Sequence, residues 1–118
     1  MKLGVNTFIW TESFDQSNFP LLPKIKGWGF DGVEVPLFVP SEFPAAEIRK
    51  AVEANGLECT ICSVLLPGLS FISDDASVRQ KTQGHVRDVV KAAAEAGARI
   101  VAGPLYSPVG YLPGRRRT

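Results

Sequence analysis

The chain has 118 residues, of which 45% are hydrophobic and 21% charged, a composition typical of one globular domain. The formal net charge is +1, and the one strongly basic feature is the arginine run 115–117. A short basic run of this kind is most often a solvated segment, so no nucleic-acid partner is expected. No apolar run approaches the roughly 18 residues of a membrane span, and the first residues do not have the pattern of a signal peptide. Two cysteines close together do not indicate a framework of disulfide bonds. These features predict a cytoplasmic protein without a membrane partner.

The first third of the chain contains two β-prone runs separated by a helix. Residues 3–10 are predicted to form the first strand. The following helix is predicted to be capped by Asn18, to carry Pro20 in its first turn, and to end at the glycines around Trp28. Residues 31–35, introduced by a tight turn, are predicted as the second strand.

The middle of the chain repeats this order. Residues 41–55 are predicted to form a helix in which Ile48 and Val52 lie one turn apart. Gly56 stands where a glycine commonly follows the last helical residue. Residues 57–66 are predicted as the third strand.

The longest helix is predicted to begin at Asp74 and Asp75 and to end at Gly97. Its apolar stripe has 3.6-residue spacing and comprises Val78, Thr82, Val86, Val89, Val90 and Ala93. Residues 99–103 are predicted as the fourth strand. Because strands that alternate with helices over short connections are parallel neighbours, the predicted fold class is α/β with the order β-α-β-α-β-α-β.

The two faces of the predicted strands differ in chemistry. One face carries the apolar pairs Leu3 and Val5, Val33 and Val35, and Cys59 and Ile61. The opposite face carries small or polar residues together with one phenylalanine: Gly4, Asn6, Phe8, Glu34, Thr60 and Cys62. A doubly wound sheet is usually apolar on both faces, so one mixed face predicts a barrel wall that is polar near its C-terminal mouth.

Cys59 and Cys62 have the spacing of a redox or zinc motif. In an extended strand, however, an offset of three places the two sulfurs on opposite faces, about 10 Å apart along the strand. A redox or zinc pair needs sulfurs that converge, so neither function is predicted. We expect Cys59 to be a small core residue and Cys62 to lie on the polar face toward the pocket end.

Four other side chains are candidates for chemistry. Glu34 is a carboxylate within an apolar strand, so it is either paired structurally or part of a site. His85 is the single histidine and lies on a helix expected outside the barrel, which predicts a surface or packing residue. One histidine supports neither a histidine-based metal site nor a Ser-His-Asp triad. Trp10 and Phe14 follow the first strand, where aromatic residues either line a sugar pocket or close the end of a barrel.

Several segments together carry a resemblance to a known superfamily. They are Trp10 at the end of the first strand, Gly-Phe-Asp-Gly-Val-Glu at 29–34, Gly-Leu at 56–57 before a cysteine-bearing strand, and Ala-Gly-Ala at 96–98. This pattern resembles the amino-terminal part of the sugar phosphate isomerase/epimerase superfamily, which has the xylose isomerase-like TIM barrel. Residues 103–110 most resemble the ketose 3-epimerases that act on tagatose, psicose and ribulose.

The resemblance covers essentially the whole chain and implies one partial domain over residues 1–118, the (βα)3β amino-terminal portion of a (β/α)8 barrel. It implies a reaction in which a proton is abstracted from C3 of a ketose and returned to the other face. Two glutamates act as acid and base, and a divalent metal (manganese, cobalt or magnesium) polarises the carbonyl. The metal ligands of the family, two Glu, one Asp and one His, lie on later strands of a barrel that needs about 250 residues. We therefore expect a chain truncated before those residues and inactive alone, with no catalytic residue and no metal ligand to assign.

The resemblance also implies part of a sugar pocket. Cys62 matches a family cysteine on the third strand that lines the far end of the substrate, and Leu105 lies in the loop that walls the pocket. Phe14 stands where the family often has tryptophan, Asn6 where an aromatic residue is common, and Val109 near another usual tryptophan. A small-molecule ketose is the expected partner. The predicted substrate contacts are Asn6, Trp10, Phe14, Glu34, Cys62, Leu105 and Val109.

Two alternatives stay open. The first is another branch of the superfamily, such as hydroxypyruvate isomerase, inosose dehydratase or an apurinic-site endonuclease. The endonuclease branch usually has a metal-binding histidine where this chain has Cys62 and Ser63. The second is a non-catalytic product, either a truncated reading frame or a partial-barrel module that assembles with a partner chain. Because the first and fourth strands are open edges, we expect self-association.

Overall fold

A sheet of four parallel strands, in the order β1-β2-β3-β4, forms the centre of the molecule. The computed structural model describes residues 1–112 and 114. The strands are β1 (Gly4–Asn6), β2 (Gly32–Pro36), β3 (Glu58–Cys62) and β4 (Val101–Ala102). Each strand pairs with the next along the chain, so every connection crosses over, as the α/β prediction requires. The prediction of the fold class is confirmed.

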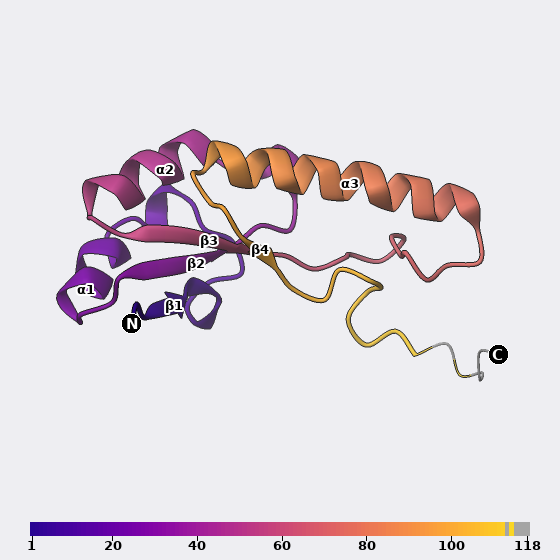
Figure 1. The fold of residues 1–118 in the computed structure, drawn as a ribbon, viewed down its shortest axis with the longest axis horizontal. Helices are drawn as coiled ribbons and strands as arrows, with labels where there is room; N and C mark the ends of the chain where they lie inside the picture. The colour runs from indigo at the N-terminus through magenta and orange to yellow at the C-terminus, as the bar shows by residue number, and fades with distance from the viewer. Residues whose placement is uncertain (113, 115–118) are drawn as a thin grey trace.

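Helices fill the crossovers between the strands. They are α1 (Leu21–Gly27), α2 (Ala45–Ala54) and α3 (Ala76–Glu95). Figure 1 shows α2 and α3 lying along one side of the sheet. Residues 1–112 and 114 also include three short 3-10 helices: η1 (Thr7–Ile9), η2 (Gln16–Asn18) and η3 (Pro40–Glu42). Within the described residues, no helix is long and apolar enough to cross a membrane.

The apolar face predicted for the strands is the face that packs beneath the helices. Val33, Val35 and Ile61 of the sheet are fully or almost fully buried in the core. The helices contribute to the same core through Leu22 and Ile25 of α1, Ile48 and Val52 of α2, and Val89 and Ala93 of α3. Burying one such aliphatic side chain stabilises the fold by about 1.5–3 kcal/mol. Val5 and Cys59 are partly buried against this core, whereas Leu3, predicted to lie there, is exposed.

The first strand and the first helix differ from their predicted bounds. The predicted strand 3–10 ends at Asn6, because the Asn6 side chain accepts a hydrogen bond from the Phe8 N–H and caps η1. Asn18 does not cap α1; it belongs to η2, where it closes a capping box with Asp15. The helix starts at Leu21, after Pro20.

The later elements are shorter than predicted. The predicted helix 41–55 is divided into η3 and α2, because Pro44 precedes the first residue of α2. The strand predicted at 57–66 ends at Cys62, and the strand predicted at 99–103 pairs only over Val101–Ala102. On α3, Asp75 is the N-cap and Gly97 has a positive φ just past the end, as predicted, but Val90 of the predicted stripe is half exposed.

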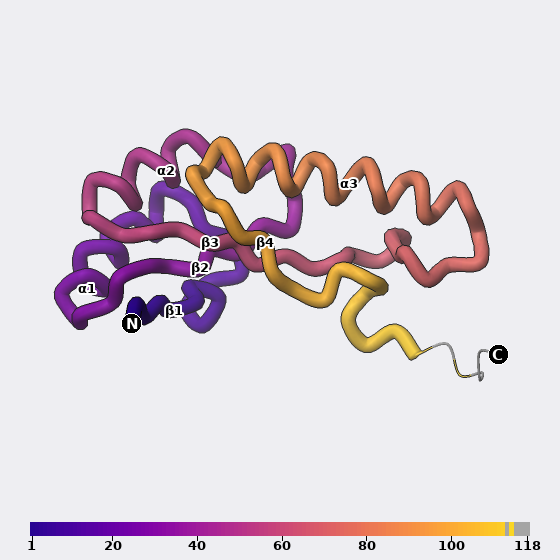
Figure 2. The backbone as a smooth tube through the Cα atoms, in the orientation of Figure 1, coloured from indigo at the N-terminus to yellow at the C-terminus, as the bar shows by residue number. Residues whose placement is uncertain are grey.

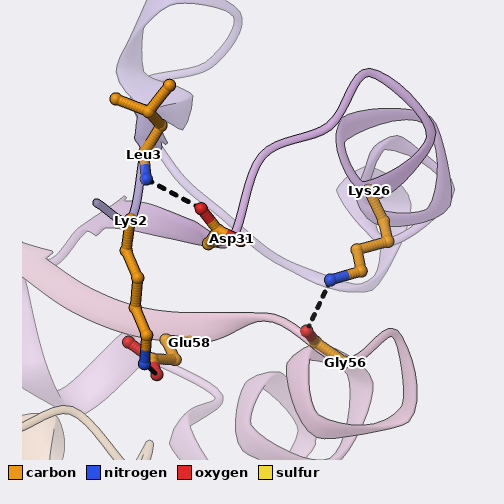
Figure 3. A network of polar contacts seen from close by, with 6 residues as sticks. All are labelled: Lys2, Leu3, Lys26, Asp31, Gly56 and Glu58. Atoms are coloured by element: carbon orange, nitrogen blue, oxygen red, sulfur yellow. Dashed lines mark hydrogen bonds and ion pairs between the residues drawn. The ribbon is translucent and has the colours of Figure 1, made fainter.

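The N-terminal ends of the strands are held by polar contacts (Figure 3). The Lys2 ammonium pairs with the Glu58 carboxylate across β2, and the Leu3 N–H donates to the Asp31 carboxylate at 2.9 Å. Lys26 of α1 donates to the carbonyl of Gly56 at 3.1 Å. The Lys2–Glu58 pair is well exposed and therefore contributes little to stability. These contacts link the N-terminal ends of neighbouring elements, whereas the strand order itself follows from the backbone pairing of β1 to β4.

At the C-terminal ends, the chain continues into two long segments that lie side by side (Figure 2). The segment after β3 meets the segment after β4 through a bridge between Leu65 and Pro108 and a hydrogen bond from the Phe71 N–H to the Tyr106 carbonyl at 2.8 Å. In the part of the chain that the structure describes, both edge strands, β1 and β4, have an open side. Self-association through these edges stays a prediction.

Close packing beside β4 makes Gly103 indispensable. Its φ is +142°, and a Cβ there would lie 1.9 Å from the carbonyl oxygen of Ser63. Ser63 is itself buried, and it donates its N–H to Ala102 at 2.9 Å and its hydroxyl to Leu37 at 2.6 Å. Burial and these two hydrogen bonds therefore restrain the residue whose oxygen an added Cβ would meet.

We therefore predict that Gly103→Ala lowers the free energy of unfolding by about 3 kcal/mol or more, because backbone strain and overpacking add. Gly27→Ala is the matched control, since nothing lies within 4 Å of the added Cβ and its φ is not positive. Denaturant unfolding of both variants and the parent measures the difference. Equal midpoints for Gly103→Ala and the parent would contradict the packing described here.

Candidate functional site

Four polar side chains line the face of the sheet opposite the helices, and we call them the inner-face cluster: Asn6, Glu34, Thr60 and Cys62. The strand register places Asn6 beside Glu34 and Glu34 beside Thr60. Glu34 accepts from the Asn6 Nδ2 at 2.8 Å and from the Thr60 hydroxyl at 3.3 Å. One carboxylate thus connects three strands: Glu34 is paired structurally, and its membership of a site stays a prediction.

Asn6 has a second set of contacts. Its Oδ1 accepts from the Phe8 N–H at 2.8 Å and lies 3.9 Å from the Cys62 sulfur. Directly after it, the buried Thr7 hydroxyl donates to the Glu34 carbonyl at 3.1 Å. Asn6 is therefore at once the end of β1, the cap of η1 and a partner of Glu34. Analysis of the sequence missed Thr7; the available signal was a hydroxyl residue following a capping asparagine.

The two cysteines lie on opposite faces of β3, as strand alternation predicts. Both are free thiols. Burial raises the pKa of the Cys59 thiol to about 11. Burial also raises the pKa of the Cys62 thiol. A hydrogen bond with the Asn6 side chain lowers this pKa, and the nearby negative charge of Glu34 raises it. At neutral pH both are therefore protonated thiols, which are poor nucleophiles and poor metal ligands.

A hollow of about 330 Å³ lies over the inner face near the cluster. Asn6, Glu34 and Thr60 line one part of it, and Cys62 does not line it. From there it extends to the N-terminal ends of the strands, where Lys2, Asp31 and Glu58 line it. Volumes near 300 Å³ are at the small end for a ligand pocket. The three side chains offer both hydrogen-bond donors and acceptors to a small polar molecule.

The other predicted substrate contacts are not part of this cluster. Trp10 is partly exposed and stacks on Trp28 with 6.1 Å between ring centroids. Phe14 is buried in the core, 6.0 Å from the Phe19 ring. In the loop after β4, Leu105 is half-buried and Val109 exposed. The structure thus brings together Asn6, Glu34 and Cys62, and a role in substrate binding stays a prediction for all seven residues.

Two other features of the sequence are not part of the site. His85 lies part-buried on α3, and within the described residues its Nε2 is buried and has no hydrogen-bond partner. The arginine run 115–117 lies outside the described residues. Among residues 1–112 and 114, no group of three His, Cys, Asp or Glu side chains is placed to hold a metal ion.

A parallel sheet whose consecutive strands are neighbours, with helices on one side and a polar face on the other, defines part of a TIM barrel. The chain belongs to the xylose isomerase-like TIM barrel family, whose family model matches residues 22–118. This finding confirms the superfamily resemblance that the sequence carries.

Similar proteins cover almost all of the chain. It is 31% identical over 114 residues to a probable ketose 3-epimerase of Synechocystis sp.. The matched region covers 97% of this chain and 40% of the relative. It is 30% identical over 108 residues to a ketose 3-epimerase of Arthrobacter globiformis, covering 91% of this chain and 37% of the relative. A crystal structure of D-allulose 3-epimerase from Methylomonas sp. has the same fold, with a TM-score of 0.87 at 18% identity over 97% of this chain and 40% of that one. The chain thus spans about two fifths of the length of the curated relatives it matches.

The arrangement of β3 predicts different reactivities for the two thiols. A small alkylating reagent under native conditions labels Cys62 before Cys59, because Cys59 is packed against the core and its thiol pKa is the more strongly raised. Raising the pH toward 11 accelerates the alkylation of Cys59, because its thiolate then forms. Peptide mass mapping over time gives both rates. Faster labelling of Cys59, or a disulfide between the two, would contradict the alternation on β3.

Proposed function

We propose that this chain forms the amino-terminal part of the sugar-binding barrel of a metal-dependent ketose 3-epimerase. The observation that carries the proposal is the inner-face cluster. It extends from Glu34 and Thr60, in the middle of β2 and β3, to Asn6 and Cys62 at the C-terminal ends of β1 and β3. TIM-barrel enzymes have their active sites at that end of the strands. Similarity to two ketose 3-epimerases over nearly the whole chain supports the choice of a ketose as substrate.

The chemistry of the cluster suits a polyhydroxylated molecule. A carboxylate has about four lone-pair positions, and Glu34 uses two of them for Asn6 and Thr60. The remaining positions accept hydrogen bonds from sugar hydroxyls, and the neutral Cys62 sulfur is a weaker acceptor beside them. Hydrogen bonds to a charged acceptor are among the stronger ones, so this face can orient a ketose.

Proton transfer at C3 needs groups that this cluster does not provide. Glu34 is held by two donors on neighbouring strands and is not a free base. The described residues do not fit a divalent cation either, because no three ligating side chains converge. We therefore assign substrate binding to this chain, and the acid, base and metal-holding groups to the part of the barrel that its longer relatives possess and that this sequence does not span.

A chimera tests the proposal. Residues 1–118 replace the corresponding segment of the Synechocystis sp. relative, and the product is assayed for C3 epimerisation of tagatose, psicose and ribulose, with and without a chelator. We expect turnover of at least one ketose, abolished by the chelator and restored by manganese, cobalt or magnesium.

The controls are the intact relative and the 118-residue chain alone, for which we expect no turnover. A folded chimera that epimerises none of the ketoses on which the relative acts would overturn the proposal. Turnover by the 118-residue chain alone would overturn the assignment of the catalytic groups to other strands.

A further inference from the structure

The orientation of the Asn6 carboxamide is fixed by two neighbours with opposite requirements. The Glu34 carboxylate only accepts hydrogen bonds, so it faces the Asn6 NH2 group at 2.8 Å. The Phe8 backbone N–H only donates, so it faces the Asn6 oxygen at 2.8 Å. Both requirements select the same orientation of the amide. With that orientation, the Asn6 oxygen lies 3.9 Å from the sulfur of Cys62.

We propose that Glu34 is a positioning residue: by holding the Asn6 carboxamide, its carboxylate directs the Asn6 oxygen to the Cys62 thiol. The thiol hydrogen is then engaged within the protein, and the sulfur lone pairs remain for a ligand on the inner face. That this ligand is a ketose rests on the proposed function. The coupling from Glu34 through Asn6 to Cys62 does not.

Glu34 can influence Cys62 in two different ways. The first is positioning, through Asn6. The second is direct repulsion of the thiolate by the carboxylate charge, which raises the pKa of Cys62. Within the described residues, Glu34 on β2 is the one charged group that acts on this thiol, and the residues paired with Cys62 across the sheet, Pro36 and Ala102, carry no charge.

Two substitutions at position 34 separate positioning from charge. Glu34→Gln removes the charge but keeps the shape, so its amide oxygen still accepts from Asn6 and its NH2 group donates to the Thr60 hydroxyl. Glu34→Leu has similar bulk and removes both hydrogen bonds. Thr60→Val is the matched control, because it removes the other bond to Glu34 and leaves the bond to Asn6 intact.

The experiment measures two rates on the 118-residue chain and its variants: alkylation of Cys62 relative to Cys59, and hydrogen exchange of the Phe8 amide. We expect Glu34→Leu to increase both by about fivefold or more, the effect of losing one hydrogen bond. We expect Glu34→Gln and Thr60→Val to stay within about twofold of the parent, since each keeps the bond to Asn6.

Equal acceleration by Glu34→Gln and Glu34→Leu would overturn the proposal in favour of direct charge, and no change in Glu34→Leu would overturn it outright. If Glu34→Leu also exposes Cys59, the sheet has loosened, and Asn6→Ala provides the decisive comparison. It removes the positioned oxygen while Glu34 remains, so Cys62 labelling rises under the proposal, and an unchanged or slower rate contradicts it. No sugar or metal enters these measurements, so failure here and failure of epimerase activity are distinguishable.

Discussion

The parallel register of β1, β2 and β3 is the constraint on which the site depends. It sets Asn6, Glu34 and Thr60 side by side on one face, so that a single carboxylate bonds to both neighbouring strands. A shift of one residue in β2 would turn Glu34 into the apolar core and move both Val33 and Val35 out of it. The cost of burying an unpaired carboxylate therefore helps to enforce the register that creates the site.

The two ends of the strands serve different purposes. At the N-terminal ends, Lys2, Asp31 and Glu58 make exposed polar contacts that tie neighbouring elements together (Figure 3). Toward the C-terminal ends, Ser63 and Gly103 pack closely, while Asn6 and Cys62 lie on the inner face of the sheet. Ligand chemistry at the C-terminal ends is usual in TIM barrels. In this chain the close packing at Gly103 lies at that end as well.

Much of the fold could be predicted from the sequence because the strands are short and alternate in polarity. The apolar face of Val33, Val35 and Ile61, and the opposite placement of Cys59 and Cys62, follow from a period of two. The bounds of the first strand could not be predicted, because an asparagine in a β-prone run ends the strand only if its side chain caps the next turn. That bond depends on Asn6 being held in place on the folded sheet.

The site was predicted only in part, for a similar reason. Alternation placed Asn6, Glu34 and Cys62 on one face, but the hydrogen bonds from Asn6 and Thr60 to Glu34 depend on strand register, which a single sequence does not specify. Phe14 also illustrates the limit, since an aromatic residue after a strand suits both a sugar pocket and a core, and here it is buried in the core.

The claim that the inner face binds a ketose is tested most directly by protection of Cys62 in the chimera with the Synechocystis sp. relative. Alkylation of Cys62 is followed with and without a saturating ketose that the chimera turns over, and Cys59 on the opposite face serves as the internal reference. Our account predicts that the sugar slows labelling of Cys62 and leaves Cys59 unchanged. Equal rates at Cys62 with and without a ketose that is being epimerised would contradict it.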